Sequence, residues 1–266
     1  MNVPPVFHHP TLGHLHLGRK PSPWNAKRLW LADYIDRKAL PPAPASVNWT
    51  ASVPTPCGMM GNDSVGDCTI AGRAHMIQVW TGNAQPPGTV LADSEVLAEY
   101  SRLSGYTPDN PASDTGLNPI EVLQDWQYNG AEGHKIRAWC NVNPKNLAEI
   151  QVATNIFGGL YAAVALPLTA QAQVGGVWDT DPSDKSSDAA PYSWGGHLAP
   201  FGGYNAQGPG AITWGQWWQQ MTWAFSVRYY DELFAVVTDD FLNTNNLDPQ
   251  GLGINDLLAD QALLGT

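Results

Sequence analysis

The chain is poor in cysteine and in basic residues, and it has no long apolar run. Its 266 residues include 3 cysteines, an odd number without regular spacing, which argues against a disulfide framework and for a reducing or redox-indifferent setting. The 24 Asp and Glu outnumber the 13 Lys and Arg, and the net charge of -11 repels phosphate backbones, so we expect no nucleic-acid partner. The longest apolar stretch, residues 156–168, is shorter than the roughly 20 residues of a membrane span, so we expect no membrane partner.

A secretory signal is also missing from the first residues. Residues 1–19 hold prolines and four histidines but no uninterrupted apolar core, which predicts no signal peptide and a cytoplasmic or virion-associated protein. These histidines lack cysteine neighbours and regular ligand spacing, and the acidic loop 179–188 lacks the Gly and Glu of an EF-hand. We therefore expect no metal and no cofactor.

The remaining composition is that of a packed globular protein, with 43% hydrophobic and 14% charged residues. Residues 1–42 are rich in Pro and His and predict an N-terminal extension, either propeptide-like or a docking arm, with one short helix over 25–37. The Pro-rich stretch 40–49 must run extended and marks a boundary. Residues 43–242 then form the main domain, and residues 243–266 form a tail with a weak helix near 254–264.

Helical patterns precede strand patterns along the main domain. Helices are expected over 69–80, 93–103, 119–128 and 146–157. Strands are expected over 160–166, 197–204, 211–215 and 233–237, with a polar loop at 173–194 and a helix within 222–232. This order indicates an α+β fold of two lobes, a helical lobe packed against an antiparallel sheet lobe, with the site in the cleft between them.

Two residues stand out as candidates for chemistry. Cys68 comes directly before the first helical pattern, where the positive end of the helix dipole lowers a thiol pKa and favours the nucleophilic thiolate. Such a thiolate needs a distant base, and His197 stands apart from the other histidines because Gly195-Gly196 precede it and an apolar strand follows. On spacing alone, an inert buried cysteine would be the commoner explanation of Cys68.

A series of collinear segments over about residues 44–238 resembles the papain-like cysteine peptidases. The segment Asn62-Asp-Ser-Val-Gly-Asp-Cys68 is similar to the family's Q-G-x-C-G-x-C, and Gly196-His197-Leu-Ala-Pro-Phe-Gly-Gly-Tyr204 is similar to its H-A-V-x-x-V-G-Y. The opening Pro44-Ala-Ser-Val-Asn-Trp49 looks like P-x-S-V-D-W, and Asp114-Thr-Gly-Leu resembles the start of the N-G-G helix. The resemblance implies a papain-like fold with Cys68 as nucleophile and His197 as general base and acid.

The resemblance also implies a third role and exposes two departures. Asn62 would donate to the oxyanion together with the Cys68 backbone amide, although the family uses the longer Gln. The family's N-S-W-G, whose Asn orients the histidine, meets Ile212-Thr-Trp-Gly here, and isoleucine makes no hydrogen bond. Thr213 or Gln216 could substitute, but a strand neighbour of the aligned position is expected to point to the opposite face.

The sequence leaves two functions open. The first is a thiol hydrolase, most simply a cysteine endopeptidase acting on a peptide or protein substrate, with an amidase or transferase as a related option. The alternative is a non-catalytic papain-fold component of a larger assembly such as a phage particle. Its partners would dock on the N-terminal arm and on a Trp-rich surface made by Trp214, Trp217, Trp218 and Trp223, which could equally fill a core or the rim of a groove.

Overall fold

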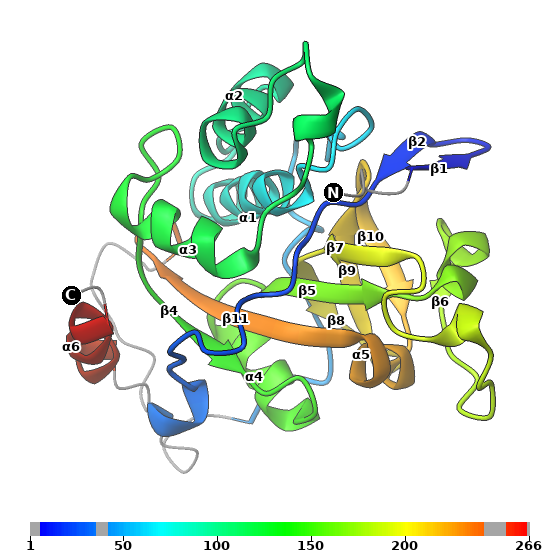
Figure 1. Ribbon diagram of the computed structural model, residues 1–266. Helices are drawn as coiled ribbons and strands as arrows, with labels where there is room; N and C mark the ends of the chain where they lie inside the picture. Colours follow the sequence, from blue (N-terminus) through cyan, green and yellow to red (C-terminus); the bar gives the residue numbers. More distant parts are fainter. Residues whose placement is uncertain (1–5, 36–41, 242–253, 265–266) are drawn as a thin grey trace.

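The computed structural model describes residues 6–35, 42–241 and 254–264. A group of helices and a group of antiparallel strands form two lobes, and the N-terminal chain runs between them (Figure 1). The helices are α1 (Cys68–Ala84), α2 (Asp93–Ser104), α3 (Pro119–Tyr128), α4 (Leu147–Ile156), α5 (Trp223–Tyr229) and α6 (Ile254–Leu264). The strands are β1 (Val6–His9), β2 (Gly13–His16), β3 (Val47–Asn48), β4 (Ile136–Val142), β5 (Tyr161–Leu166), β6 (Val177–Trp178), β7 (Gly195–Leu198), β8 (Phe201–Tyr204), β9 (Pro209–Thr213), β10 (Gln216–Met221) and β11 (Tyr230–Thr238).

Helix α1 is the central element of the helical lobe. Nearly all of its side chains are buried, because α2, α3 and the sheet strands surround it. Trp80 of α1 stacks on Trp126 of α3 with ring centroids 5.4 Å apart. Helix α3 begins at Pro119, which suits a first helical turn, and the side chain of Asn118 caps it by accepting the Glu121 N–H at 3.0 Å.

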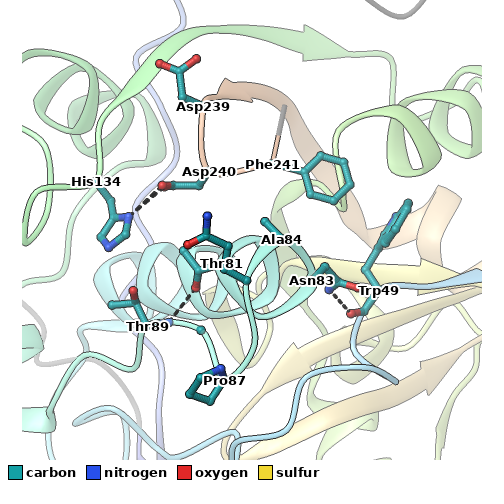
Figure 2. Close-up of a pocket in the computed structure, with 12 residues that line it drawn as sticks. Trp49, Thr81, Asn83, Ala84, Pro87, Thr89, His134, Asp239, Asp240 and Phe241 are labelled. Carbon is teal, nitrogen blue, oxygen red and sulfur yellow. Dashed lines mark hydrogen bonds and ion pairs between the residues drawn. The ribbon is translucent and has the colours of Figure 1, made fainter. Parts of the chain in front are cut away.

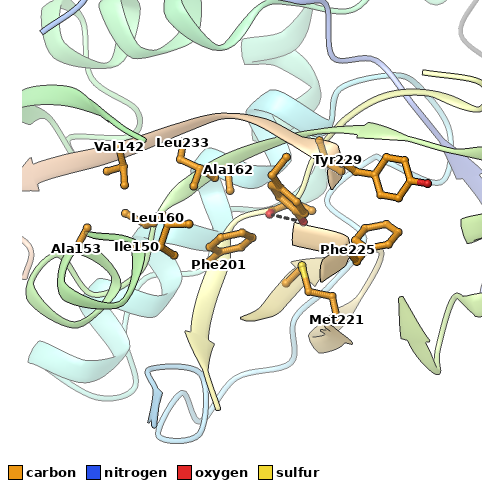
Figure 3. Packing of buried hydrophobic residues seen from close by; sticks show 14 of the residues in the cluster. Val142, Ile150, Ala153, Leu160, Ala162, Phe201, Met221, Phe225, Tyr229 and Leu233 are labelled. Carbon is orange, nitrogen blue, oxygen red and sulfur yellow. Dashed lines mark hydrogen bonds between the residues drawn. The ribbon is translucent and has the colours of Figure 1, made fainter. Parts of the chain in front are cut away.

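The sheet lobe is built from two sheets. Strands β4, β11, β5 and β7 form one in that order, with antiparallel pairing throughout. Strands β3, β8, β9, β10 and β6 form the other, in which only the β10–β6 pair is parallel. The core between them brings together side chains such as Leu160, Phe201 and Phe225 (Figure 3).

The predicted α+β fold is confirmed, as are helices at the four expected sites in the first part of the main domain. The single strand expected over 197–204 is two strands, β7 and β8, separated at Ala199-Pro200, where proline has no N–H for a ladder. Strands β4 and β10 were not expected from the sequence. The helix at 254–264 is present as α6.

The N-terminal residues contribute to the core. Strands β1 and β2 pair as a hairpin, and Leu15, Leu17 and Leu31 are fully buried with the sheet lobe. The prediction of a helix over 25–37 is wrong for the described part of that range, which holds only a short 3-10 turn at Leu31–Asp33. Residues 36 and 37 of that range lie outside the described residues. Within the described ranges, no helix is long and apolar enough to cross a membrane.

Candidate active site

Cys68 is the first residue of α1 and is almost completely buried. The helix packs against β7, and Gly72, one turn along, allows this close approach: a side chain there would meet the Leu198 methyl 2.3 Å away. The first turn of α1 is thereby held against the strand that carries His197. Burial raises the pKa of the Cys68 thiol, and the backbone of Leu198 and of Gly18 opposes this shift in part.

His197 lies on β7 and is held by two residues of the β9–β10 hairpin. Its Nε2 is 2.7 Å from the Thr213 hydroxyl oxygen, and its ring stacks on Trp214 with centroids 4.2 Å apart and planes 16° apart. Its Nδ1 is buried and has no hydrogen-bond partner among the described residues. Of the two ring nitrogens, Nδ1 is therefore the one without a hydrogen-bond partner among these residues.

The structure overturns the expectation that Thr213 faces away from His197. Ile212, at the position aligned with the family's Asn, packs with Val53 and Val79 on the far face of its sheet. Thr213 then points to the opposite face, which is the one that His197 occupies. Side chains do alternate along β9, but position 213, and not position 212, faces the histidine.

Trp214 is held in an unusual backbone conformation. Its φ of 46° is left-handed, a region that costs a non-glycine residue about 1–2 kcal/mol. Two contacts of its side chain oppose that cost: the stack on His197 and a hydrogen bond from its indole N–H to the His16 carbonyl at 3.3 Å. Local strain of this kind is found where the surrounding structure must fix a side chain in one place.

Asn62 lies in the loop before α1 and is buried. Its side-chain amide donates to the Val65 carbonyl at 3.1 Å, and its backbone carbonyl accepts the His16 N–H at 3.1 Å. The same side chain also interacts with the buried Asp67 carboxyl and lowers its pKa against the larger, raising effect of burial. The oxyanion role of Asn62 stays a prediction.

Residues 16–20 of the N-terminal extension run between the two lobes and hydrogen-bond to both (Figure 1). On the helical side, Leu117 N–H donates to the Gly18 carbonyl at 3.0 Å and the Leu117 carbonyl accepts the Lys20 N–H at 2.9 Å. On the sheet side, Arg19 N–H donates to the Gly196 carbonyl at 3.1 Å. We refer to residues 16–20 as the cleft segment.

Glycines allow the cleft segment to lie so close to the site. A methyl group at Gly18 would fall 1.7 Å from the Gly66 carbonyl oxygen, and one at Gly116 would fall 1.7 Å from the Gly18 carbonyl oxygen. Either contact is far inside van der Waals distance. The segment therefore rests directly on backbone two residues before Cys68.

Burial sets the protonation states of the two candidate catalytic groups. It raises the pKa of the Cys68 thiol to about 12 and lowers the pKa of His197 to about 3. Both groups are therefore neutral near pH 7, as thiol and imidazole.

Asp67, directly before Cys68, is fully buried, and neither of its carboxylate oxygens has a hydrogen-bond partner among the described residues. Burial raises its pKa well above the ordinary value, and a weaker interaction with the Asn62 side chain, short of hydrogen-bond geometry, opposes this shift. The folded protein therefore keeps this proton to higher pH than the unfolded chain does. Asp67 stabilises the fold below its ordinary pKa, and that contribution is lost as the pH rises through the folded-state pKa.

We expect Asp67→Asn to raise the free energy of unfolding near pH 8 by about 1–3 kcal/mol, because the amide carries no charge to desolvate. Urea unfolding at pH 8 and pH 5 measures this gain, which should shrink at the lower pH. Asp63→Asn, at an exposed position nearby, is the matched control. An equal gain at both pH values would show that the effect has another origin.

The four tryptophans of the proposed Trp-rich surface do not behave alike. Trp214 is buried beside His197, whereas Trp217, Trp218 and Trp223 are partly buried. Trp217 contacts His75 of α1 edge-on, and its indole N–H donates to the Thr55 carbonyl at 3.1 Å. Trp214 and Trp217 thus pack around the candidate site. For Trp218 and Trp223, a role in binding a protein partner stays a prediction.

A cavity of about 680 Å³ lies away from Cys68, at the far end of α1 (Figure 2). His134 and Asp240 face each other in it, with Nδ1 3.0 Å from both carboxylate oxygens. Asn83 donates to the Trp49 carbonyl at 2.7 Å on the other side. Among the described residues, no group of three His, Cys, Asp or Glu side chains is placed to hold a metal ion.

No family model matches the sequence, and no curated protein matches it. Solved structures do match. Xylellain, a cysteine protease from Xylella fastidiosa, superposes with a TM-score of 0.62 at 14% identity, covering 84% of this chain and 96% of that one. Digestive procathepsin L 3 of the Tenebrio molitor larval midgut gives 0.54 at 12% identity, covering 83% and 76%.

A third structure, the cysteine protease and lectin-like domains of Cwp84 from Clostridium difficile, gives 0.55 at 10% identity over 86% of this chain and 57% of that one. These proteins share a papain-like architecture, and this chain has the papain-like fold. At such identities the likeness concerns the fold, so the chemistry must be argued from the residues of this chain.

Proposed function

We propose that this protein is a cysteine peptidase whose active site is covered by its own cleft segment. The observation that carries the proposal is the set of contacts around His197. One ring nitrogen is held by Thr213, and the ring is stacked on Trp214. The other nitrogen has no hydrogen-bond partner in the described part of the chain, and its strand packs against α1, which begins at Cys68. A nucleophile, a base and a residue that orients the base form the recurrent constellation of acyl transfer.

In this proposal, Cys68 gives its proton to His197 Nδ1 and attacks the carbonyl carbon of a peptide bond. The backbone N–H of Cys68 and the side-chain amide of Asn62 stabilise the negative oxygen of the tetrahedral intermediate. His197 then protonates the leaving amine, and the acyl-thioester remains on Cys68. A water molecule, deprotonated by His197, hydrolyses the thioester and regenerates the thiol.

Latency follows from the burial of the two groups. The free thiol and neutral imidazole under the cleft segment are the unreactive protonation states, and the segment also occupies the space that a peptide would need. Displacement of the segment would hydrate both groups and lower the pKa of Cys68. The extension then acts as a propeptide-like cover rather than as a docking arm.

The test uses the full chain carrying Gly18→Ala, whose methyl group cannot coexist with the Gly66 carbonyl. We expect this variant to hydrolyse peptides from a mixed fluorogenic library. Adding Cys68→Ala or His197→Ala should lower the rate at least about 1,000-fold, because each removes a partner of the transferred proton. Circular dichroism and thermal unfolding check that the variants remain folded.

A non-catalytic papain-fold protein would give a different result. The Gly18→Ala variant would remain folded, with Cys68 no more reactive than Cys57 or Cys140, and no peptide would be cleaved. That outcome would contradict the peptidase proposal and favour a binding role.

A further inference from the structure

The side chain of Arg19 fills an acidic pocket next to the candidate active site. It is fully buried, forms ion pairs with Asp231 at 3.0 Å and with Glu232, and lies near the Tyr192 ring, 5.6 Å from its centroid. The two carboxylates stand at the start of β11, and Tyr192 lies in the loop before β7. The Tyr192 hydroxyl also contacts both Arg19 and Asp231.

The backbone of Arg19 lies within one residue of His197. The backbone N–H of Arg19 donates to the Gly196 carbonyl at 3.1 Å, directly before His197 in the chain. A side chain at Gly196 would fall 2.2 Å from the Arg19 carbonyl, so this position must stay a glycine for any chain to lie there. A peptide placed along the same stretch of β7 would direct one side chain into the space of Arg19.

The charges of the pocket are satisfied by the extension. Among the described residues, the hydrogen bonds to the Glu232 carboxylate come from Arg19, Ser22 and Arg28, and all three precede residue 42. Arg28 pairs with Glu232 at 2.9 Å, and the Glu232 side chain is only 8% exposed. When the cleft segment leaves, a nearly buried carboxylate loses its most buried cationic partner.

A buried carboxylate without a cation is costly, so the opened site favours a ligand that restores the pairing. Asp231 and Glu232 present carboxylate oxygens from adjacent residues to the guanidinium of Arg19. A planar guanidinium with several N–H donors suits this arrangement better than the point charge of lysine.

We propose that Glu232, with Asp231 and Tyr192, forms a substrate subsite selective for arginine, so that the peptides cleaved carry arginine next to the scissile bond. This inference rests on the proposed peptidase function. Arg19 holds the subsite in the covered state, and the arginine of a substrate takes its place in the open one. Glu232 is then the residue that determines specificity.

The test compares matched fluorogenic peptides that differ only in arginine or citrulline, the neutral isostere of arginine, at each position around the scissile bond. In the Gly18→Ala background we expect arginine to raise kcat/KM at least about tenfold at one position, since the carboxylates then pair with a charge. Glu232→Gln should reduce this ratio to within about threefold of unity. Glu121→Gln removes one exposed charge elsewhere and should keep the ratio.

A binding experiment separates failure of the subsite from failure of the peptidase. Fluorescence anisotropy of the same peptides on Gly18→Ala/Cys68→Ala reports affinity without turnover. Tighter binding of the arginine peptide, lost in Glu232→Gln, supports the subsite even where no variant hydrolyses peptides. Equal affinity for arginine and citrulline peptides, or hydrolysis that ignores arginine at every position, overturns it.

Discussion

Gly18→Ala should increase the rate of Cys68 alkylation by iodoacetamide at pH 7 at least about 100-fold over the unaltered chain, because hydration lowers a thiol pKa that burial holds near 12. The new methyl group overlaps the Gly66 carbonyl oxygen and must lift the cleft segment. Peptide mass spectrometry across a pH series measures the rate for each cysteine. The pH at which Cys68 reacts at half its maximal rate should fall in the variant.

The chain supplies its own controls for this result. Gly176→Ala adds a methyl group at a site where the nearest atom is 3.5 Å away, so it should leave Cys68 unreactive. Cys57 and Cys140 are buried elsewhere, and burial raises the pKa of both thiols. If the alkylation rates of Cys57 and Cys140 rose together with that of Cys68, the variant would be unfolding rather than releasing the cleft segment alone. An unchanged Cys68 rate in a folded variant would show that the segment does not control access.

Thr213→Val is expected to lower kcat/KM about 100-fold in the Gly18→Ala background, because valine has the shape of threonine but cannot hold His197 Nε2. Thr213→Ser keeps the hydroxyl and should retain most of the activity. The loss should appear in kcat and should be accompanied by a shift of Cys68 alkylation to higher pH, since a free imidazole ring stabilises the thiolate less well.

Stability provides a second measurement for the same residue. In Thr213→Val, a buried ring nitrogen has no partner, which costs about 1–3 kcal/mol of unfolding free energy. Thr213→Ser should cost much less. If valine and serine variants were equally active, Thr213 would be a packing residue and His197 would be oriented by Trp214 alone.

The positions of Cys68 and His197 could be predicted because their signals are local. A helical repeat begins at Cys68, and a glycine pair followed by an apolar strand surrounds His197. These patterns determine secondary structure over a few residues, and the order of motifs then determines which lobes face each other. The α+β fold could be predicted correctly because it depends on this order of helices and strands.

The role of Thr213 and the path of the cleft segment could not be predicted in the same way. Which face of β9 meets His197 depends on how β9 is placed relative to β7, and these strands are separate in the sequence. The alternation of side chains along one strand does not tell which of its two faces points to the other strand. The close contact of Gly18 with Gly66 and Gly116 joins three separate segments without any local pattern. Glycines suited to a turn and glycines suited to a close approach look alike in a single sequence.

The anchoring of the extension affects how readily the proposed active site could be uncovered. Leu15 and Leu17 are buried in the sheet lobe on one side of Arg19, and Leu31 is buried on the other, so the cover is tethered at both ends. A tethered ligand competes at an effective concentration on the order of millimolar or above, whatever the protein concentration. Dilution would therefore leave the covered state intact, and substrate would have to compete within the molecule.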